Sequence, residues 1–240
     1  LSERAKSLGA HSVMITPTRD GLGPDQSTII EYYERIYKAL GDDVPIVLQD
    51  HPASTTVHMD VTTIKTILQE SCPSVRCVKL ESTPTLPKIR DLTAWIDREN
   101  VDATILTGLG GLYGLFDLEA GSDGFMTGFA FPEILMALRE AVLVNDDLET
   151  ARALYQKYLP LIVFEQQPGV AVRKEIYKLR GLFDSTHVRH PGKNFPPVGT
   201  QQRDGIARQL TDCVNFVLCG VQKQNGGSID LTRKIPRSEE

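Results

Sequence analysis

The sequence predicts an α/β protein in which helices cover a parallel sheet. Short apolar segments alternate with longer amphipathic ones along residues 1–145. The short segments are mainly apolar and do not alternate between apolar and polar residues, which is typical of strands buried on both faces. Proline or glycine follows most segments, as expected where a strand or helix ends. Two architectures fit this order, an open doubly wound sheet and a (β/α)₈ barrel.

The first half of the chain alternates helix and strand signals. Gly9 and Gly41 are suited to end helices because glycine readily adopts the left-handed conformation. Asp60 is suited to cap the start of a helix. A loop with Gly21 and Gly23 follows the first strand. The expected elements are a helix at 1–8, a strand at 12–16, a helix at 25–40, a strand at 46–49, a helix at 60–70 and a strand within 74–83.

The second half continues the alternation and then becomes helical. Pro84 and Pro87 precede a helix, and a glycine-rich turn at 108–111 leads to a short helix that ends near Ala120. The expected elements are a helix at 88–100, strands at 103–107 and 124–128, and helices at 132–144, 148–158, 170–180 and 203–221. A helical region at 146–222 and a polar tail at 223–240 therefore follow the strand-bearing part at 1–145.

The composition is that of an ordinary globular protein. The chain has 240 residues, of which 41% are hydrophobic and 24% charged, enough for one large core. The net charge of −5 gives no electrostatic footprint for nucleic acid or an anionic membrane. No apolar stretch has the length of a membrane span, and no signal peptide is visible. We expect a cytoplasmic protein without nucleic-acid or membrane partners. Because the chain lacks an initiator methionine and begins inside a helix pattern, we also expect it to be part of a longer protein.

Cysteines and histidines do not predict a metal or redox site. The cysteine spacings match no zinc or redox motif, so free thiols are expected at Cys72, Cys77, Cys213 and Cys219. His187 and His190 lie just before Pro191 and Gly192; a metal site there is one interpretation, and a solvated loop is the favoured one. We expect no metal and no cofactor.

One lysine stands inside an apolar strand. Lys79 shares a strand face with Val75 and Cys77 and lies near the strand's C-terminal end. A buried amine tends to lose its proton, becomes nucleophilic and forms Schiff bases with ketones. The alternative is a lysine that extends from the strand end into solvent.

Polar side chains stand at the ends of the other predicted strands. In a parallel barrel these ends carry the chemistry. The residues are Thr16, Gln49, Asp50, Thr107 and Thr127. No Gly-x-Gly-x-x-Gly follows the first strand, so a dinucleotide fold lacks its main support. The turn that starts at Gly108 is a weak phosphate-loop candidate, and a tight turn allowing close backbone approach is the favoured interpretation.

These strand ends resemble those of the dihydrodipicolinate synthase / N-acetylneuraminate lyase family. The matching segments are Gly9-Ala10, Ile15-Thr16-Pro17, Pro45-Ile46-Val47-Leu48-Gln49-Asp50-His51-Pro52, Val78-Lys79 and Thr107-Gly108. The resemblance covers residues 5–208. It implies class I, pyruvate-type aldolase chemistry on a (β/α)₈ TIM barrel with extra C-terminal helices, in a protein that is often a homo-oligomer. Lys79 matches the family's Schiff-base lysine.

The resemblance also implies a register within the barrel. The five predicted strands match the family's fourth to eighth strands, so residues 1–145 correspond to the C-terminal portion of the barrel. The Thr-Thr-Gly-Glu type loop of the family's second strand, which holds the substrate carboxylate, has no counterpart in this sequence. We expect the missing strands either in an upstream segment or to be replaced by a partner.

Other family residues differ here. Gln49 stands where the family usually has its proton-relay tyrosine, and an amide cannot shuttle protons. His51 or Asp50 could take that role, since imidazole and carboxylate groups serve as general acids and bases; the alternative is that both merely cap the loop. Ser54 stands where the synthase has its carboxylate-binding arginine.

Two further charged residues near the predicted site allow two interpretations each. Thr18-Arg19 replaces the family's Tyr-Tyr; Arg19 could bind an acidic substrate group, although a solvated loop arginine is favoured. Glu81 could act in catalysis, although a charge at a helix N-terminus is favoured.

Two hypotheses about function follow. The first is a Schiff-base lyase acting on pyruvate or a sugar-derived 2-keto acid, by aldol chemistry or dehydration, with Lys79 as nucleophile and His51 or Asp50 moving protons. Its expected substrate-binding residues are Thr16, Gln49, Thr107, Gly108 and Thr127. The substitutions at Gln49 and Ser54 argue against lysine-pathway synthase activity. The second hypothesis is a non-catalytic subunit that serves in assembly or interaction.

Overall fold

The computed structural model describes residues 1–17, 25–166 and 169–190, and these fall into two compact units. The first unit contains residues 1–108 and 113–126, and the second contains 109–112 and the chain from Thr127 onward. Several sequence predictions lie outside the described residues: the loop with Gly21 and Gly23, Arg19, the helix at 203–221, the polar tail, and the thiols of Cys213 and Cys219.

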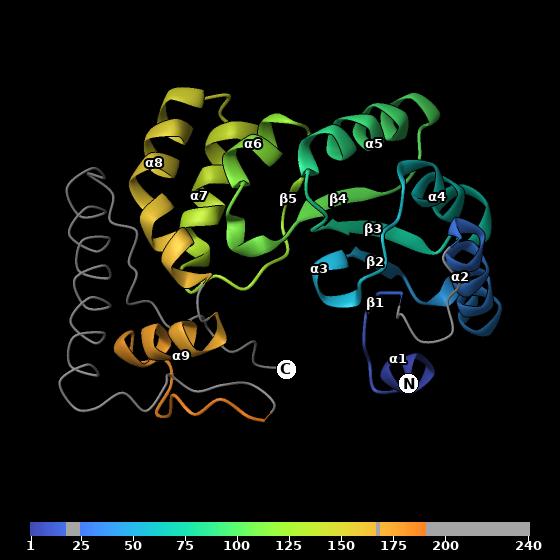
Figure 1. Ribbon diagram of the computed structural model, residues 1–240, viewed down its shortest axis with the longest axis horizontal. Coiled ribbons are helices and arrows are strands. Elements are labelled where there is room, and N and C mark those ends of the chain that lie inside the picture. Colours follow the sequence, from blue (N-terminus) through green and yellow to red (C-terminus); the bar gives the residue numbers. More distant parts are fainter. Residues whose placement is uncertain (18–24, 167–168, 191–240) are drawn as a thin grey trace. The chain divides into compact units, whose positions relative to one another are not determined.

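The first unit is built on a parallel sheet of five strands in the order β1-β2-β3-β4-β5 (Figure 1). The strands are β1 (Val13–Ile15), β2 (Ile46–Asp50), β3 (Val75–Leu80), β4 (Thr104–Thr107) and β5 (Gly124–Phe125). All neighbouring pairs are parallel. The predicted parallel α/β arrangement is therefore confirmed, and the carboxyl ends of the strands lie along one edge of the sheet.

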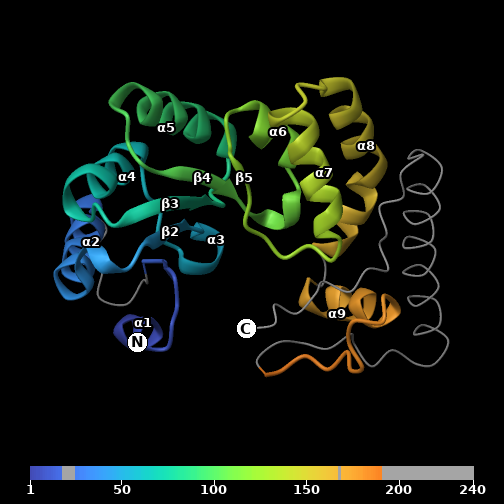
Figure 2. The same ribbon diagram turned by 180° about the vertical axis from the view of Figure 1, so that it is seen from behind.

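Helices connect successive strands of this unit (Figures 1 and 2). The connecting elements are α2 (Gln26–Leu40), α3 (Pro52–Thr55), α4 (Val61–Thr66), a π-helical turn (Ile67–Ser71), α5 (Thr85–Glu99) and α6 (Gly114–Glu119), while α1 (Ser2–Ser7) precedes β1. A 3₁₀ turn, Gly41–Asp43, follows α2. The predicted cap is confirmed, because the Asp60 side chain accepts a hydrogen bond from the Thr63 N–H.

Two predictions about helices of this unit need correction. Helix α5 begins at Thr85, three residues before the predicted start, because Pro87 lies in its first turn, where a helix needs no N–H donor. The sequence pattern also missed α3, a single turn that starts at Pro52 immediately after β2. Both errors concern prolines that the sequence analysis placed at element boundaries and that the structure places inside the first turn of a helix.

The two faces of the sheet differ in character. Strand residues of one face, Leu48, Val78, Leu80 and Ile105 among them, join a buried cluster with residues of the helices, such as Tyr33, Ile64 and Leu92. Because side chains alternate along a strand, Gln49, Lys79 and Leu106 belong to the opposite face. Lys79 is thus separated from the main core by the thickness of the sheet.

The second unit contains three α-helices among its described residues, besides a 3₁₀ turn at Leu109–Gly111. They are α7 (Pro132–Leu143), α8 (Leu148–Glu165) and α9 (Val170–Leu179). Helix α8 continues past the predicted end at Tyr158 and through Pro160. Leu161 and Ile162, which follow this proline, are buried, so packing offsets the lost backbone hydrogen bond. Strand β5 is shorter than predicted and ends at Phe125.

Side chains of α8 and α9 hold the segment that leads from β5 to α7. The Glu165 carboxylate accepts the Ala130 N–H at 2.9 Å and lies 3.3 Å from Arg173 Nε. Arg180 binds the Ala130 carbonyl oxygen and the Glu133 carboxylate. Tyr177 donates to the Phe129 carbonyl oxygen at 3.4 Å. Glu165 is 1% exposed, and its burial raises its pKa to about 7, against the lowering effects of the Ala130 N–H and Arg173.

The raised pKa predicts how the stability of this unit depends on pH. A carboxyl with a folded pKa of about 7 and an ordinary value of 4.5 binds its proton more tightly in the folded state. The free energy of unfolding therefore falls as pH rises through this range, by an amount on the order of 1–3 kcal/mol. In Glu165→Gln this loss should vanish, so the variant should gain stability relative to the parent between about pH 5 and about pH 8.

Urea unfolding of both proteins at several pH values measures this difference. Glu140→Gln is the matched control, because Glu140 is exposed on α7. A stability difference between Glu165→Gln and the parent that stays constant over the pH range would contradict a titrating Glu165.

Candidate active site

Lys79 is the next-to-last residue of β3 and lies beside Gln49 of β2. The register pairs Gln49 with Lys79, and Lys79 with Leu106 of β4. Register partners of parallel strands point to the same side of the sheet, so the Gln49 and Lys79 side chains are neighbours. The Lys79 side chain is 12% exposed, which places the amine largely out of solvent.

Glu81 brings the predicted residues together. One of its carboxylate oxygens, Oε2, lies 3.3 Å from Lys79 Nζ and accepts a hydrogen bond of 2.6 Å from Gln49 Nε2. The same oxygen lies 4.0 Å from His51 Nδ1. The Glu81 side chain is 8% exposed. An amine, an amide and an imidazole therefore surround a single buried carboxylate oxygen.

The favoured interpretation of Glu81 from the sequence, a charge at a helix N-terminus, is wrong. Helix α5 begins at Thr85, four residues further on, so Glu81 is not a helix N-terminal charge. The backbone stays in register past the end of β3, because the Glu81 N–H donates to the Asp50 carbonyl oxygen at 2.9 Å. Glu81 thus keeps the strand alternation and shares the face of Lys79. The two-residue spacing from Lys79 was the signal that could have revealed this placement.

Gly108 makes room for the Glu81 side chain. A Cβ atom added at Gly108 would lie 2.1 Å from Glu81 Oε1 and 2.5 Å from its Cγ. Any larger residue would therefore displace the carboxylate from its place beside Lys79. The expectation that this turn permits close approach to the backbone is confirmed at Gly108. The group that approaches the backbone there is the Glu81 side chain.

His51 lies where β2 meets α3. It precedes Pro52 at the start of α3, and its side chain makes no capping hydrogen bond. Its Nδ1 atom is 2.8 Å from Ser54 Oγ, and its side chain is 26% exposed. Ser54 therefore orients the imidazole, and the ring has both a buried neighbour, Glu81, and access to solvent.

Asp50 lies on the other face of the sheet, which argues against the predicted role in proton transfer. Its side chain is fully buried. Its Oδ2 atom accepts hydrogen bonds of 2.6 Å from Ser82 Oγ and of 2.6 Å from Lys88 Nζ. Strand alternation is the physical reason, because adjacent residues of β2 must point in opposite directions and Gln49 faces Lys79.

The three predicted threonines are placed differently. Thr16 lies next to Gln49, because its Oγ1 donates to the Gln49 carbonyl oxygen at 3.2 Å. Thr107 is 1% exposed and pairs in register with Leu80, so its side chain belongs to the face opposite Lys79, and this argues against a direct side-chain contact with substrate. Thr127 belongs to the second unit, where its Oγ1 accepts the Gly110 N–H.

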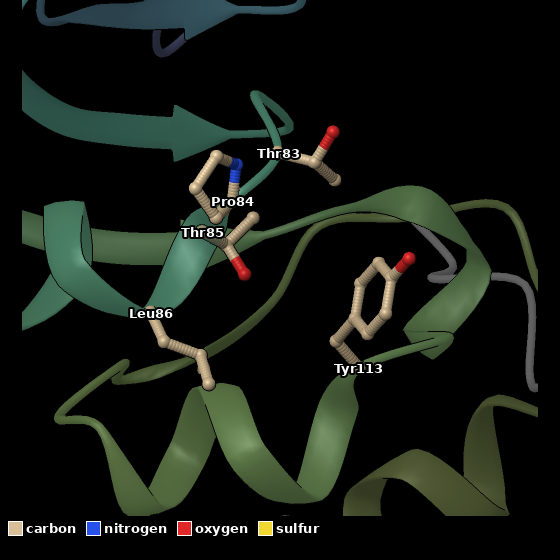
Figure 3. Close-up of a pocket in the computed structure, with 5 residues that line it drawn as sticks. All are labelled: Thr83, Pro84, Thr85, Leu86 and Tyr113. Atoms are coloured by element: carbon tan, nitrogen blue, oxygen red, sulfur yellow. The ribbon is translucent and has the colours of Figure 1, made fainter.

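A pocket of about 350 Å³ opens just beyond the end of β3 (Figure 3). It is lined by Thr83, Pro84, Thr85, Leu86 and Tyr113. Thr83, Thr85 and Tyr113 carry its hydroxyl groups, of which that of Thr85 donates to Asp117 Oδ1 at 2.7 Å, and most of the wall is apolar. Sequence analysis did not single out this pocket, because α5 and α6 bring its residues together from separate parts of the chain.

The described residues contain no cluster of three or more histidine, cysteine or acidic side chains suited to hold a metal ion. His187 and His190 lie in an irregular segment after α9, as the favoured interpretation predicted. Cys72 and Cys77 are free, buried thiols, which confirms that prediction for these two. In the part of the chain that the structure describes, no helix is long and apolar enough to span a membrane.

The fold and this arrangement define a class of protein. A lysine amine at the carboxyl end of a parallel strand, with a carboxylate and an imidazole beside it, has the groups that Schiff-base chemistry and proton transfer require. The comparison with known families agrees. Residues 1–212 match the model of the Dihydrodipicolinate synthetase family, and the chain belongs to that family.

Known relatives are consistent with this assignment. The chain is 33% identical over 229 residues to L-2-keto-3-deoxyarabonate dehydratase from Azospirillum brasilense, which covers 89% of this chain and 68% of the relative. It is 32% identical to the crystal structure of dihydrodipicolinate synthase from Rhodopseudomonas palustris, with a TM-score of 0.77 over 88% of this chain and 68% of that one. The Aquifex aeolicus synthase, at 22% identity and a TM-score of 0.72 over 88% and 68% of the two chains, supports the fold alone.

These findings establish the broad function. The chain is a lyase of the class I aldolase family, which acts on 2-keto acids through a Schiff base. The family and the solved structures imply a TIM barrel, of which the described residues form a parallel sheet of five strands with covering helices.

Proposed function

We propose that this protein dehydrates a keto-deoxy sugar acid and that Lys79 is its Schiff-base lysine. The observation that carries the proposal is the position of Glu81 Oε2, 3.3 Å from Lys79 Nζ and 4.0 Å from His51 Nδ1. This oxygen is within reach of the amine, and one bridging water would connect it to the imidazole. The 33% identity to a 2-keto-3-deoxyarabonate dehydratase supports the choice of substrate class.

The chemistry follows from these positions. The Lys79 amine attacks the C2 carbonyl of the substrate, and loss of one water gives an iminium. Glu81 removes a proton from C3, and the electron pair is held as an enamine. Expulsion of the C4 hydroxyl, protonated by His51, releases a second water and leaves an unsaturated iminium. Hydrolysis of that iminium consumes one water and frees Lys79, so the net change is the loss of one water.

Glu81 and His51 would replace the family's tyrosine relay. Gln49 stands at the tyrosine position and donates its amide N–H to Glu81 at 2.6 Å. This hydrogen bond holds the carboxylate in place beside the Lys79 amine. Ser54 stands at the position of the synthase arginine and lies 2.8 Å from His51 Nδ1. Both substituted positions therefore serve the proton-transfer pair.

The finer features of the family are part of the proposal. We propose that β1 to β5 correspond to the fourth to eighth strands of a (β/α)₈ barrel and that the enzyme is a cytoplasmic homo-oligomer. Thr16, Gly108 and Thr127 stand at or beyond the carboxyl ends of β1, β4 and β5, where barrel enzymes bind substrate. The pocket at Thr83 and Tyr113 offers hydroxyl groups for the hydroxylated part of a sugar acid.

Borohydride trapping tests the nucleophile. Treating the complete protein with pyruvate and borohydride should add one pyruvyl group, mapped by mass spectrometry to the peptide that contains Lys79. The adduct should disappear in Lys79→Arg and persist in Lys65→Arg, because Lys65 pairs with Asp91 at the surface of α4 and α5. An adduct on another lysine, or none with any 2-keto acid, would refute the assignment of Lys79.

Substrate assays test the reaction class. With the complete protein, dehydration of L-2-keto-3-deoxyarabonate or a related 2-keto-3-deoxy acid should exceed condensation of pyruvate with aspartate semialdehyde by at least about 100-fold in kcat/KM. The physical reason is that neither Gln49 nor Ser54 supplies the tyrosine or arginine on which the condensation relies. Lys79→Arg is the blank for both assays. Efficient condensation would show that other groups replace these two.

A further inference from the structure

A second lysine, Lys88, is held on the face of the sheet opposite to Lys79. Its Nζ atom donates to Asp50 Oδ2 at 2.6 Å, to Ser82 Oγ at 2.8 Å and to the Met59 carbonyl oxygen at 2.7 Å. These three acceptors use all three N–H donors of an ammonium group. The Lys88 side chain is 16% exposed and that of Asp50 is 0% exposed. Neither group faces the substrate side of the strands.

The acceptors of Lys88 are the chain neighbours of the active-site residues. Asp50 immediately precedes His51, and Ser82 immediately follows Glu81. Ser82 Oγ also donates to Asp50 Oδ2 at 2.6 Å, and the Glu81 N–H donates to the Asp50 carbonyl oxygen at 2.9 Å. Lys88, Asp50 and Ser82 therefore join the ends of β2 and β3 on the face opposite to Lys79. Glu81 joins the same strand ends on the Lys79 face.

We propose that Lys88 is a positioning residue which, through Asp50 and Ser82, fixes the Glu81 carboxylate between Lys79 and His51. The inference rests on the proposed function. A displacement of about 1 Å in a proton-transfer group is enough to cost about 100-fold in rate, so the separation of the two strand ends matters to turnover. Lys88 touches neither substrate nor reacting atoms.

The geometry requires a lysine at this position. Three acceptors from different segments converge on one point. A rotatable ammonium group can donate to all three of them, and the planar guanidinium of an arginine cannot. Without Lys88, the buried Asp50 carboxylate would lose its positive partner, and Asp50 Oδ1 already has no hydrogen-bond partner among the described residues. The strand ends would then rearrange to bring water to Asp50.

The test compares Lys88→Met with Lys65→Met, a control that removes a surface lysine. In the complete protein, Lys88→Met should still form the borohydride-trapped adduct at Lys79, but kcat on the dehydration substrate should fall by about 10–100-fold. KM should change by less than about threefold, and the pH profile of kcat should shift, because Glu81 no longer lies between its two nitrogens. Lys65→Met should match the parent in all three.

A second variant separates positioning from folding. Lys88→Met combined with Asp50→Asn leaves no buried unpaired charge, so it should regain stability in urea without regaining kcat or the parent's pH profile. Parent-like kcat and pH profile in the folded double variant would overturn the inference. If the parent protein itself traps no 2-keto acid at Lys79, the proposed function fails, whereas a trapping parent with a fully active Lys88→Met variant refutes only the role of Lys88.

Discussion

The arrangement of this site depends on one buried carboxylate. Moving the Glu81 carboxylate out of water is costly unless charged and hydrogen-bonding partners surround it. Lys79 and Gln49 are such partners, and both lie on the same sheet face at the same register level. Gly108 is small because the carboxylate occupies the space of a side chain there. The identity of several residues is thus explained by the need to hold one group in place.

Strand alternation divides the chemistry from its support. Gln49 and Lys79 point to one side of the sheet, while Asp50 points to the other. Two ion pairs result, Lys79 with Glu81 on one face and Lys88 with Asp50 on the other. Similar residue types therefore have different roles a few residues apart. The Lys79–Glu81 pair lies on the face proposed for the Schiff-base chemistry, and the Lys88–Asp50 pair supports the strand ends from the other face.

The order of elements and the position of Lys79 could be predicted because they depend on local patterns. Apolar runs, helix caps such as Asp60, and the strand position of Lys79 are visible within short windows of sequence. The surroundings of Glu81 and Asp50 could not be predicted because they depend on partners more than 30 residues away along the chain, Gln49 for Glu81, and Ser82 and Lys88 for Asp50. The starts of α3 and α5 were missed because a proline can either precede a helix or stand within its first turn. Local sequence does not distinguish these two positions, whereas packing does.

Exchange of the pyruvate methyl protons with D₂O, followed by NMR, tests most directly whether Glu81 moves protons next to the Lys79 iminium. The parent protein should catalyse this exchange. Glu81→Gln should still trap pyruvate at Lys79 but exchange at least about 100-fold more slowly, while Glu70→Gln, which alters an exposed residue, should exchange like the parent. Undiminished exchange in Glu81→Gln would contradict the account, because it would place the proton-transfer group elsewhere.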